Sequence, residues 1–238
     1  TVLLVDNRSP DGTLQAGVER ARERIAHCRF VAWRNDGNYG LGGSHKAAFR
    51  YAVDNGFDHV VVLHGDDQAD IRDLVPLLER GEHLHVDCLL GARFMRGSRL
   101  HGYSALRTWG NRAYNLLFSA ALGRRVRDLG SGLNVYRVAA LRDFYYEGFP
   151  DDLTFNYVML LASYARGHRV CFFPIGWREV DQVSNVRLFR QAFEVLRLWL
   201  AYVRDASAFL ARDMRAQPVA YTGSICHAHG PVRSGPRA

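Results

Sequence analysis

The stretch VVVLHGDDQ, residues 60–68, joins an uninterrupted apolar run to an acidic turn. The run predicts a strand that is covered on both faces of a sheet. Ligands of open α/β sheets bind beyond the carboxyl ends of the strands, which is where this turn lies. Side chains alternate along extended backbone, so His64, Asp66 and Gln68 point to one side. One imidazole with carboxylate and amide oxygens suits Mn²⁺ or Mg²⁺.

A second interpretation of the same turn needs no metal. Asp67 and Asp70 stand just before a predicted helix, where an aspartate side chain accepts hydrogen bonds from first-turn N–H groups. In that case the acidic residues form a solvated helix cap. Both interpretations stay open for this turn taken alone.

Around this stretch, short apolar or β-branched runs alternate with longer segments of helical period. This alternation is typical of βαβ units and predicts an α/β domain, with a mostly parallel sheet flanked by helices. The predicted strands cover residues 2–5, 29–33, 60–63, 88–92, the end of 128–136, and 170–174. The predicted helices cover residues 14–27, 44–55, 71–80, 103–122, 153–166 and 186–210.

The composition limits the partners of the chain. With 31 basic and 24 acidic side chains among 238 residues, the formal net charge is +7. Lys46 is the only lysine, a skew that indicates coding bias. A basic total favours phosphates and anionic lipid. The arginines are dispersed and no zinc-finger or RNA-binding signature occurs, which argues against nucleic acid as a partner.

The cysteines and the apolar runs indicate the kind of cellular compartment in which the protein works. Four widely spaced cysteines, at positions 28, 88, 171 and 226, argue against a zinc site or a disulfide framework and favour a reducing compartment. No apolar run approaches the roughly 18 to 20 residues that span a bilayer, and no signal peptide is recognised. From residue 211 the sequence is rich in Gly, Pro, Ala, Ser and Arg, so residues 211–238 are predicted to be a disordered tail.

A second polar turn, DNRSPDGT at residues 6–13, follows the first predicted strand. It lies at the same edge of the sheet as the acidic turn because both follow strands. Asp6 and Asn7 could bind the edge of a nucleobase. The alternative is an ordinary strand-to-helix turn with an Asx cap.

The ordered set of motifs resembles the family-2 glycosyltransferases of the glycosyltransferase-A fold, especially the branch of polyprenyl-phosphate sugar transferases such as the dolichol-phosphate mannosyltransferases. That family has V-D-D-x-S-x-D-G-T, an N-x-G-x-G loop, D-x-D-x-Q, D-x-V-x-G-S-R, a helix with arginine and asparagine, D-x-x-S-G-F-R and R-x-x-G-x-S-K. The matching segments cover about residues 1–200: VDNRSPDGT (5–13), the glycine-rich loop 35–43, HGDDQ (64–68), DCLLGAR (87–93), residues 107–115, DLGSGLNVYR (128–137) and REVDQVSN (178–185).

The chain departs from the family pattern at several points. His64 replaces the first aspartate of D-x-D, Asn7 replaces the second aspartate of V-D-D, and Asn185 replaces the lysine of the last motif. The family's first strand and its P-x-Y-N-E turn would precede Thr1, so the resemblance implies a nucleotide-binding sheet without its first strand.

The resemblance implies a catalytic domain at residues 1–185, with a nucleotide-sugar half at about 1–95 and an acceptor half at about 96–185. It implies an inverting, metal-dependent sugar transfer in which Mg²⁺ or Mn²⁺, held by His64, Asp66 and Gln68, stabilises the departing pyrophosphate. Arginines of the second half could hold phosphate oxygens. The implied donor-binding residues are Asp6, Asn7, Asp11, Asn35, Gly40, Asp66, Arg107, Arg112 and Arg178.

The acceptor decides whether a catalytic base is needed. A sugar hydroxyl of a growing glycan needs a carboxylate base, for which Asp151 and Asp152 are the candidates. Their alternative role is to cap the helix predicted from residue 153. A polyprenyl phosphate is already anionic and needs no base.

The predicted helix at 186–210 carries an apolar stripe, while Arg190, Arg197 and Arg204 recur every seven residues. A basic amphipathic helix predicts peripheral contact with an anionic membrane, here at its cytoplasmic face; the alternative is packing against the catalytic domain. Two other functions stay open. One is a degenerate nucleotide-sugar-binding scaffold. The other is a sugar-phosphate nucleotidyltransferase, which would need a glycine-rich pyrophosphorylase loop that the sequence lacks.

Overall fold

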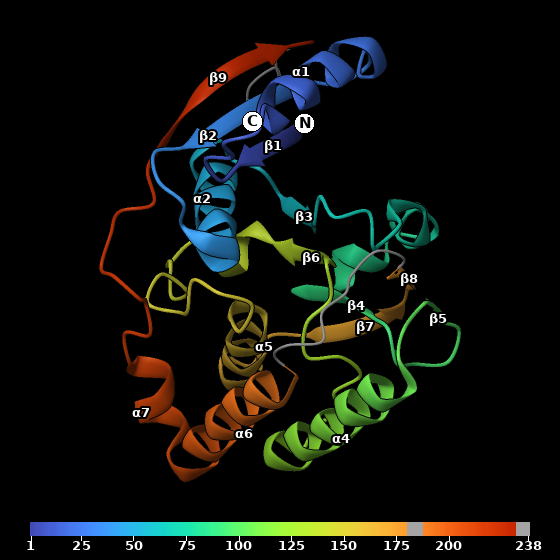
Figure 1. Ribbon diagram of the computed structural model, residues 1–238, viewed down its shortest axis with the longest axis vertical. Helices are drawn as coiled ribbons and strands as arrows, with labels where there is room; N and C mark the ends of the chain where they lie inside the picture. Colours follow the sequence, from blue (N-terminus) through green and yellow to red (C-terminus); the bar gives the residue numbers. More distant parts are fainter. Residues whose placement is uncertain (180–187, 232–238) are drawn as a thin grey trace. The chain divides into compact units, whose positions relative to one another are not determined.

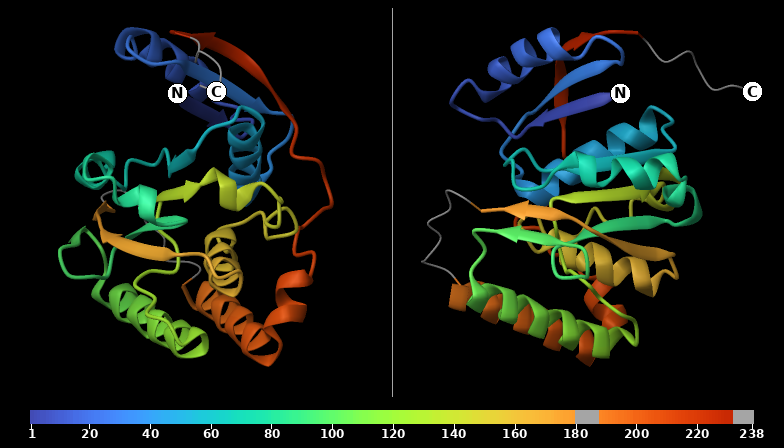
Figure 2. Two further views of the ribbon diagram at one scale, coloured as in Figure 1. Left: turned by 180° about the vertical axis from the view of Figure 1, so that it is seen from behind. Right: turned by 90° about the vertical axis from the view of Figure 1, so that its right-hand side faces the viewer.

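The computed structural model describes residues 1–179 and 188–231. The chain divides into two compact units, each of which is described by itself (Figures 1 and 2). The first unit holds residues 1–57, 144–155 and the described residues from Met214 onward. The second unit holds residues 58–143 and the described part of 156–213.

The first unit is built on a three-stranded sheet of order β1-β2-β9 (Figure 1). Strands β1 (Val2–Asp6) and β2 (Phe30–Asn35) are parallel, and β9 (Gly223–His229) runs antiparallel to β2. Helix α1 (Thr13–Arg24) and helix α2 (Gly40–Asp54) complete the unit.

Alternation along β2 explains how the two helices cover the sheet. Phe30 and Ala32 are buried in a cluster with Leu14 and Ala21 of α1. Trp33, one position further on, points the other way and its ring meets Tyr51 of α2 at 6.1 Å. The period of two in the sequence therefore places one helix on each face of the sheet.

Strand β9 shows that the predicted disordered tail is wrong for the described part of residues 211–238. The segment Gly223–His229 pairs with β2 and protects an edge that would otherwise expose unpaired backbone groups. Gly223 permits the pairing, because a side chain there would approach Trp33 Nε1 to 2.5 Å. A composition shift does not reveal such a non-local partner. Residues 232–238 lie outside the described chain.

Two neighbouring histidines of β9 lead us to expect that the stability of this strand depends on pH. His227 Nε2 lies 3.1 Å from His229 Nδ1, and Arg22 of α1 lies 3.3 Å from His227 Nδ1. Burial, with Arg22 and His229, lowers the pKa of His227 below its usual 6.5. The unfolded chain therefore takes up the proton more readily, and the stability that His227 contributes is present above pH 6.5 and is lost as pH falls through the lowered pKa.

Amide hydrogen exchange tests this expectation at about pH 7.5 and about pH 5.5, on either side of the ordinary imidazole pKa. The protection factors of β9 should fall at the lower pH. The variant His227→Gln should reduce that loss. An equal loss in the variant would show that His227 does not cause it.

The second unit is built on a four-stranded mixed sheet of order β3-β6-β4-β7. It contains β3 (His59–Leu63), β6 (Leu133–Arg137), β4 (Cys88–Ala92) and β7 (Val170–Pro174). Strand β6 is antiparallel to both β3 and β4, whereas β4 and β7 are parallel. A short parallel pair, β5 (Arg99–His101) and β8 (Gly176–Arg178), lies beside it. The α/β class is confirmed, with mixed sheets in place of a mostly parallel one.

Strand β3 is less covered than its apolar run predicts. Within the described chain it pairs only with β6, so it is an edge strand. Val61 is 41% exposed and Leu63 is 43% exposed. The prediction of a strand buried on both faces is therefore wrong for β3.

The helices of the second unit pack on the sheet. A buried cluster joins Leu74 and Leu77 to Leu89 of β4 and Val135 of β6. The predicted helix at 71–80 is divided into η1 (Ile71–Asp73) and α3 (Val75–Glu79), which has Pro76 in its first turn. The remaining short helices are η2 (Glu82–His85) and η3 (Val138–Leu141), and α5 (Phe155–Ala165) lies on the other face, where Cys88 Sγ contacts Ser163 Oγ at 3.5 Å.

Two long helices, α4 (Ala105–Leu122) and α6 (Leu188–Arg204), lie side by side in the second unit (Figure 1). Tyr114 Oη donates to Ala192 O at 2.7 Å, and Trp199 Nε1 donates to Leu117 O at 3.0 Å. The predicted helix at 186–210 is interrupted at Asp205, whose side chain caps α7 (Ala206–Ala211). Among the described residues, the helices lack the combination of length and apolar character that crossing a bilayer requires.

Candidate functional site

The acidic turn after β3 lies in the second unit. Asp66 is exposed, and its Oδ1 accepts a hydrogen bond from the Gln68 N–H at 3.1 Å. Asp67 adopts a left-handed conformation with φ of 56°. The helix-capping role falls to Asp70, which accepts from Arg72 N at 2.9 Å. The Asp66 carboxylate is therefore solvent-accessible and is not consumed as the helix cap.

His64 begins this turn from a half-buried position. Its N–H donates to Gly132 O at 2.9 Å, and a side chain at Gly132 would approach the imidazole to 3.1 Å. Burial lowers the pKa of His64; Asp66 opposes this effect and Arg93 adds to it. The imidazole is thereby kept neutral, which is the form that binds a metal ion.

Arg178 lies beside the same turn, as predicted for a phosphate-binding arginine. The guanidinium of Arg178 contacts the two carboxylate oxygens of Asp67 at 3.1 and 3.2 Å. The backbone N–H of Arg178 donates to Gln68 O at 2.9 Å. Arg107 pairs with Glu179, the next residue along the chain, at 2.5 Å. The partner of Arg107 therefore directly follows Arg178 in the chain, so Arg107 is linked through Glu179 to the segment that carries Arg178.

Arg112 does not join this group. It is exposed on α4, where its guanidinium lies 5.6 Å from the centroid of the Trp109 ring. Arg107 and Arg112 are five positions apart in one helix and point to different sides.

A buried ion pair in the second unit joins Arg93 to Asp128. Arg93 donates to Asp128 through Nε and Nη2, each at 2.8 Å, and through its backbone N–H at 2.9 Å. The side chain of Arg93 is 11% exposed and that of Asp128 is 1% exposed. The pair joins two of the sequence motifs, 87–93 and 128–137, and neither residue was predicted as a site residue.

The side chains of this turn fit a divalent ion that is shared with a ligand phosphate. In the parts of the chain that the structure describes, no group of three or more His, Cys, Asp or Glu side chains could hold a metal ion. Mg²⁺ is commonly bound through one or two carboxylates plus substrate phosphates, without an all-protein cage. An exposed Asp66 beside a neutral His64 suits that mode of binding.

The second set of predicted residues lies in the first unit, after β1. Asn7 Oδ1 accepts from Tyr39 N at 2.8 Å and from Asn35 Nδ2 at 3.1 Å. Asn7 Nδ2 donates to Asn38 Oδ1 at 2.7 Å. An aspartate at position 7 could not donate this last bond. The structure therefore gives a local reason for the departure from the V-D-D pattern.

Asp6 and Asp11 have structural partners as well. Asp6 is buried, accepts from Ser9 N at 3.2 Å and lies 3.6 Å from Arg34 Nε. The Thr13 side-chain and backbone hydrogen bonds to Asp11 lower the pKa of its carboxyl. The Asp11 side chain thus closes a local turn with Thr13, while Gly12 is the N-cap of α1 and, among the described residues, no side chain caps that helix. Donor binding by Asp6 and Asp11 stays a prediction.

The glycine-rich segment begins α2 four residues before the predicted cap at Ser44. Gly40 has φ of 68°, and a side chain there would approach Asp151 O to 2.3 Å. The Gly42 N–H donates to the same carbonyl at 2.8 Å. These two glycines are thus required by the close approach of the chain around Asp151.

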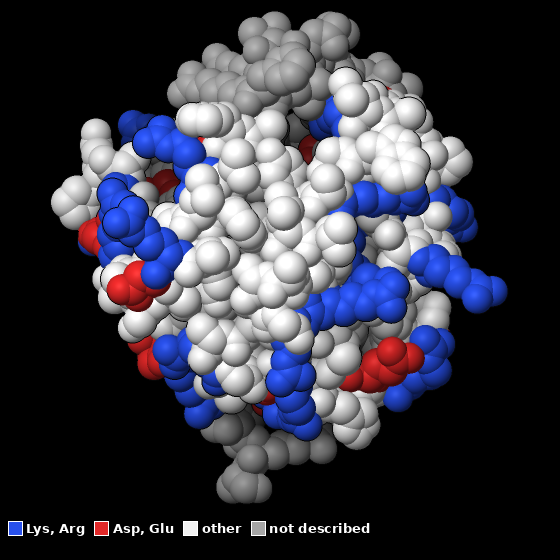
Figure 3. Space-filling model, turned by 90° about the horizontal axis from the view of Figure 1, so that it is seen from below, with Lys and Arg blue, Asp and Glu red and all other residues white. Residues whose placement is uncertain are grey.

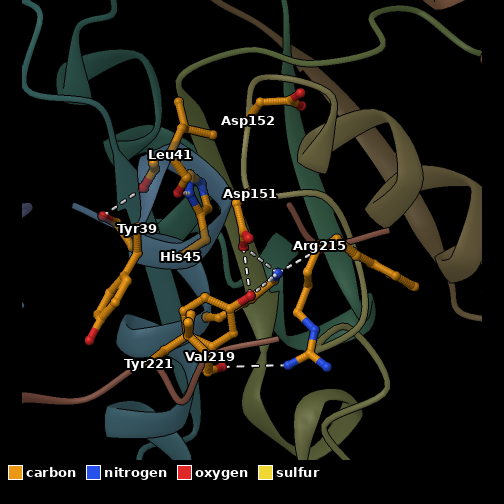
Figure 4. Close-up of polar contacts among 12 residues, drawn as sticks. Tyr39, Leu41, His45, Asp151, Asp152, Arg215, Val219 and Tyr221 are labelled. Atoms are coloured by element: carbon orange, nitrogen blue, oxygen red, sulfur yellow. Dashed lines mark hydrogen bonds and ion pairs between the residues drawn. The ribbon is translucent and has the colours of Figure 1, made fainter. Parts of the chain in front are cut away.

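Asp151 is held in a buried polar cluster (Figure 4). Its Oδ1 accepts from Lys46 Nζ and from Tyr221 Oη, each at 2.7 Å. Lys46 also donates to Phe149 O at 2.5 Å and is 1% exposed. Burial and the Asp151 carboxylate raise the pKa of Tyr221. The only lysine of the chain thus joins α2 to the 144–155 segment, a role that its isolation in the sequence did not reveal.

Asp152 points away from this cluster (Figure 4). Its Oδ1 accepts from the Thr154 N–H at 2.8 Å and from Thr154 Oγ1 at 2.6 Å. The capping alternative therefore describes its geometry. A catalytic role for Asp151 or Asp152 stays a prediction.

Comparison with known proteins identifies the family of the chain. Residues 1–145 match the model of a family described as glycosyl transferase family 2. The chain is 28% identical over 186 residues to an undecaprenyl-phosphate mannosyltransferase of Micrococcus luteus, covering 75% of this chain and 72% of that protein.

Among solved structures, residues 1–349 of S. aureus TarS superpose with a TM-score of 0.54 at 20% identity. The match covers 86% of this chain and 56% of the TarS chain, so this chain spans little more than half the length of that relative. At this identity the similarity supports the fold alone. Because the family match extends over more than half of its residues, this chain belongs to glycosyl transferase family 2.

Proposed function

We propose that this protein is an inverting glycosyltransferase that moves a sugar from a nucleotide-sugar donor to a polyprenyl phosphate. The observation that carries the proposal is the turn after β3, where an exposed Asp66 follows a neutral His64 and Arg178 lies alongside. Family membership and the printed name of the Micrococcus luteus relative support the reaction class and the acceptor class.

In this proposal Asp66 and His64 would hold Mg²⁺ or Mn²⁺, with Gln68 adjacent. The ion would supply Lewis-acid stabilisation of the departing pyrophosphate. Arg178 contributes positive charge next to the phosphates, and its guanidinium is 53% exposed and can exchange Asp67 for a phosphate. Arg107, in the same unit, is retained as a positioning group. Donor binding by the first-unit residues Asp6, Asn7, Asp11, Asn35 and Gly40 stays a prediction.

The acceptor oxygen attacks the anomeric carbon on the face opposite the leaving group. The new bond joins that carbon to the lipid phosphate, while the bond to the donor pyrophosphate breaks and a nucleoside diphosphate leaves. A phosphate oxygen is already anionic, so neither Asp151 nor Asp152 has to remove a proton. Asp152→Asn should therefore leave transfer to a polyprenyl phosphate intact, whereas a sugar-hydroxyl acceptor would make this carboxylate a candidate base.

The first experiment is a donor screen by thermal shift, with UDP-, GDP- and dTDP-sugars in the presence of Mn²⁺. Stabilisation that requires both a nucleotide sugar and the metal would support the proposal. Nucleotide binding without transfer would favour the degenerate scaffold, an interpretation that fits the hydrogen bond donated by Asn35 Nδ2 to Asn7 Oδ1.

We also propose that α4 and α6 bring the protein onto an anionic membrane surface. Large apolar side chains on both helices are strongly exposed, while Val195 and Tyr202 form the buried side of α6. Figure 3 shows a broad uncharged area bordered by basic side chains on the face where these helices lie. The exposed apolar residues are Leu106, Trp109 and Leu116 on α4, and Phe193, Leu200 and Val203 on α6.

Arginines stand among these apolar residues. Arg112 lies over the Trp109 ring and Arg197 lies 5.8 Å from the centroid of the Phe193 ring. Apolar insertion combined with basic charge is the chemistry of peripheral binding to anionic lipid. The side of α6 that carries Val195 and Tyr202 is buried, as the packing alternative expects. In this proposal α6 packs with that side and contacts the membrane with its exposed side. The protein would then work at the cytoplasmic face, where anionic lipid is enriched.

Liposome co-sedimentation tests this placement. Removing two charges in Arg112→Gln/Arg197→Gln should weaken binding to vesicles of phosphatidylcholine and phosphatidylglycerol by roughly 30-fold at low salt, from about 1 kcal/mol for each charge. Added salt should likewise weaken the binding of the unmodified protein to these vesicles. The control is Leu84→Ser, which removes an exposed apolar side chain outside α4 and α6. Equal binding to neutral and anionic vesicles would contradict the proposal.

A further inference from the structure

A pocket of about 230 Å³ lies in the first unit between β2, α2 and the C-terminal segment. Three aromatic side chains contribute to its wall: Trp33 from β2, Tyr51 from α2 and Tyr221 from the C-terminal segment. This pocket contains none of the residues that the proposed sugar transfer uses. It is therefore a feature of the chain that the transfer does not explain.

The three rings offer mainly carbon surface to a ligand, and the polar atoms of two of them already have partners. Trp33 Nε1 donates to Asn35 Oδ1 at 3.0 Å, and Tyr221 Oη donates to Asp151. The Trp33 and Tyr51 rings meet edge to face, at an angle of 68°. Each of the rings is half-buried, so part of each remains accessible.

The rim of the pocket is polar and comes from the last turn of α2. Arg50, Asp54 and Asn55 are exposed there and together offer hydrogen-bond donors and acceptors. The positive charge of Arg50 is offset by its ion pair with Glu147, while Asp54 adds a negative charge. The C-terminal end of a helix carries partial negative charge as well. The rim therefore disfavours an anion such as a nucleoside diphosphate or a lipid phosphate.

We propose that this pocket binds a single neutral pyranose ring of a carbohydrate. A pyranose has an apolar face of C–H groups that packs against aromatic rings, and a belt of hydroxyl groups that both donate and accept hydrogen bonds. Trp33, Tyr51 and Tyr221 provide the first surface, and the α2 rim provides the second. The volume is below the roughly 300 to 1,000 Å³ of pockets for larger ligands, which fits one ring in place of an oligosaccharide.

The pocket depends on the C-terminal segment being in place. Tyr221 is fixed by Asp151 and by Lys46 Nζ, which lies 2.8 Å from its hydroxyl oxygen. The pairing of β9 with β2 begins two residues later, at Gly223. The same strand that protects the edge of the sheet thus completes the sugar pocket.

Saturation-transfer NMR on the full chain tests the proposal. The probes are methyl glycosides of mannose, glucose and galactose at roughly 10 mM, a concentration suited to millimolar Kd values. EDTA is present and nucleotide sugar is absent, so that metal-dependent donor binding does not contribute. We expect saturation transfer to at least one glycoside and no competition by inorganic phosphate. No saturation transfer to any of the three glycosides, or displacement of a bound glycoside by phosphate, would overturn the proposal.

Variants locate the binding and separate it from the transfer function. Asp54→Ala and Tyr51→Leu should each weaken glycoside binding by about tenfold, or 1.4 kcal/mol. Glu23→Ala, an exposed acidic change on α1, should not. Asp54 is exposed, so its variant is informative even if Tyr51→Leu folds poorly. Unchanged glycoside binding in Asp54→Ala would overturn the proposal. Metal-dependent nucleotide-sugar binding should be equal in all these proteins, and its absence in all of them would contradict only the proposed transfer.

Discussion

Replacing Asp66 by asparagine is expected to weaken metal-dependent binding of a nucleotide sugar by about 100-fold or more, the loss of a ligand worth several kcal/mol. The carboxylate is exposed, and the asparagine oxygen can still accept the Gln68 N–H. The melting temperature should therefore stay within about 2 °C of the unmodified protein, as for most surface substitutions. Calorimetric titration with the best donor, with and without Mn²⁺, measures the effect.

The neighbouring carboxylate supplies a matched control. Asp67→Asn makes the same change of charge in the same turn, at a side chain that is 89% exposed and pairs with Arg178. Its effect should be several-fold smaller, because the Asp67 carboxylate contacts Arg178 and is not a proposed metal ligand. Equal losses in the two variants would mean that the turn acts through its total charge and that Asp66 is not a ligand.

Replacing Asp128 by asparagine is expected to lower the free energy of unfolding by about 3 to 5 kcal/mol, because it leaves the buried Arg93 charge without its counterion. For a protein of this size that corresponds to a fall in Tm of roughly 6 to 20 °C. Thermal melts followed by circular dichroism measure it.

Two further variants make the cause of this loss specific. Asp143→Asn removes a carboxylate from an exposed pair with Arg166, which should cost at most about 1 kcal/mol. The double variant Arg93→Met/Asp128→Leu removes both buried charges and should recover much of the loss. If the double variant were less stable than Asp128→Asn, unpaired charge would not be the cause.

The sequence was most informative where an apolar run is followed directly by a polar turn, because such a turn lies at the carboxyl end of a strand. The run at 60–63 and the acidic turn after it predicted a strand and an exposed polar turn, and both are present. The order of the longer strands and helices through residue 174 likewise follows from apolar periodicity, whereas the short strand β5 was not predicted. Periodicity could not show that β3 is an edge strand, since that depends on which strands lie next to it.

Long-range contacts explain the predictions that failed. Ser44 was expected to begin α2, yet the helix begins at Gly40, where the backbone of Asp151 approaches from 111 positions away in the chain. The structure shows chain packing against Gly40 and Gly42 of this loop, and donor binding by Gly40 stays a prediction. β9 was missed for the same reason, because its partner β2 is almost 200 positions away.

The candidate site was predicted in part. His64, Asp66, Gln68 and Arg178 were identified by position and do lie in one turn and the strand beside it. Arg93 and Asp128 were present in the quoted motifs, but their pairing depends on a contact across 35 positions that no local pattern encodes. Arg112 shows the converse case, since a motif placed it with the phosphate-binding arginines and the helix face places it with Trp109.

The proposed reaction is the transfer of a sugar to a polyprenyl phosphate with inversion, using a metal held at Asp66. Its most direct test is to incubate the protein with each nucleotide sugar, Mn²⁺ and a polyprenyl phosphate in anionic vesicles, and to determine the anomeric configuration of the lipid product by NMR. The account predicts a lipid-linked sugar of inverted configuration that is lost with EDTA and in Asp66→Asn. A product of retained configuration, or nucleotide-sugar binding without any product, would contradict it.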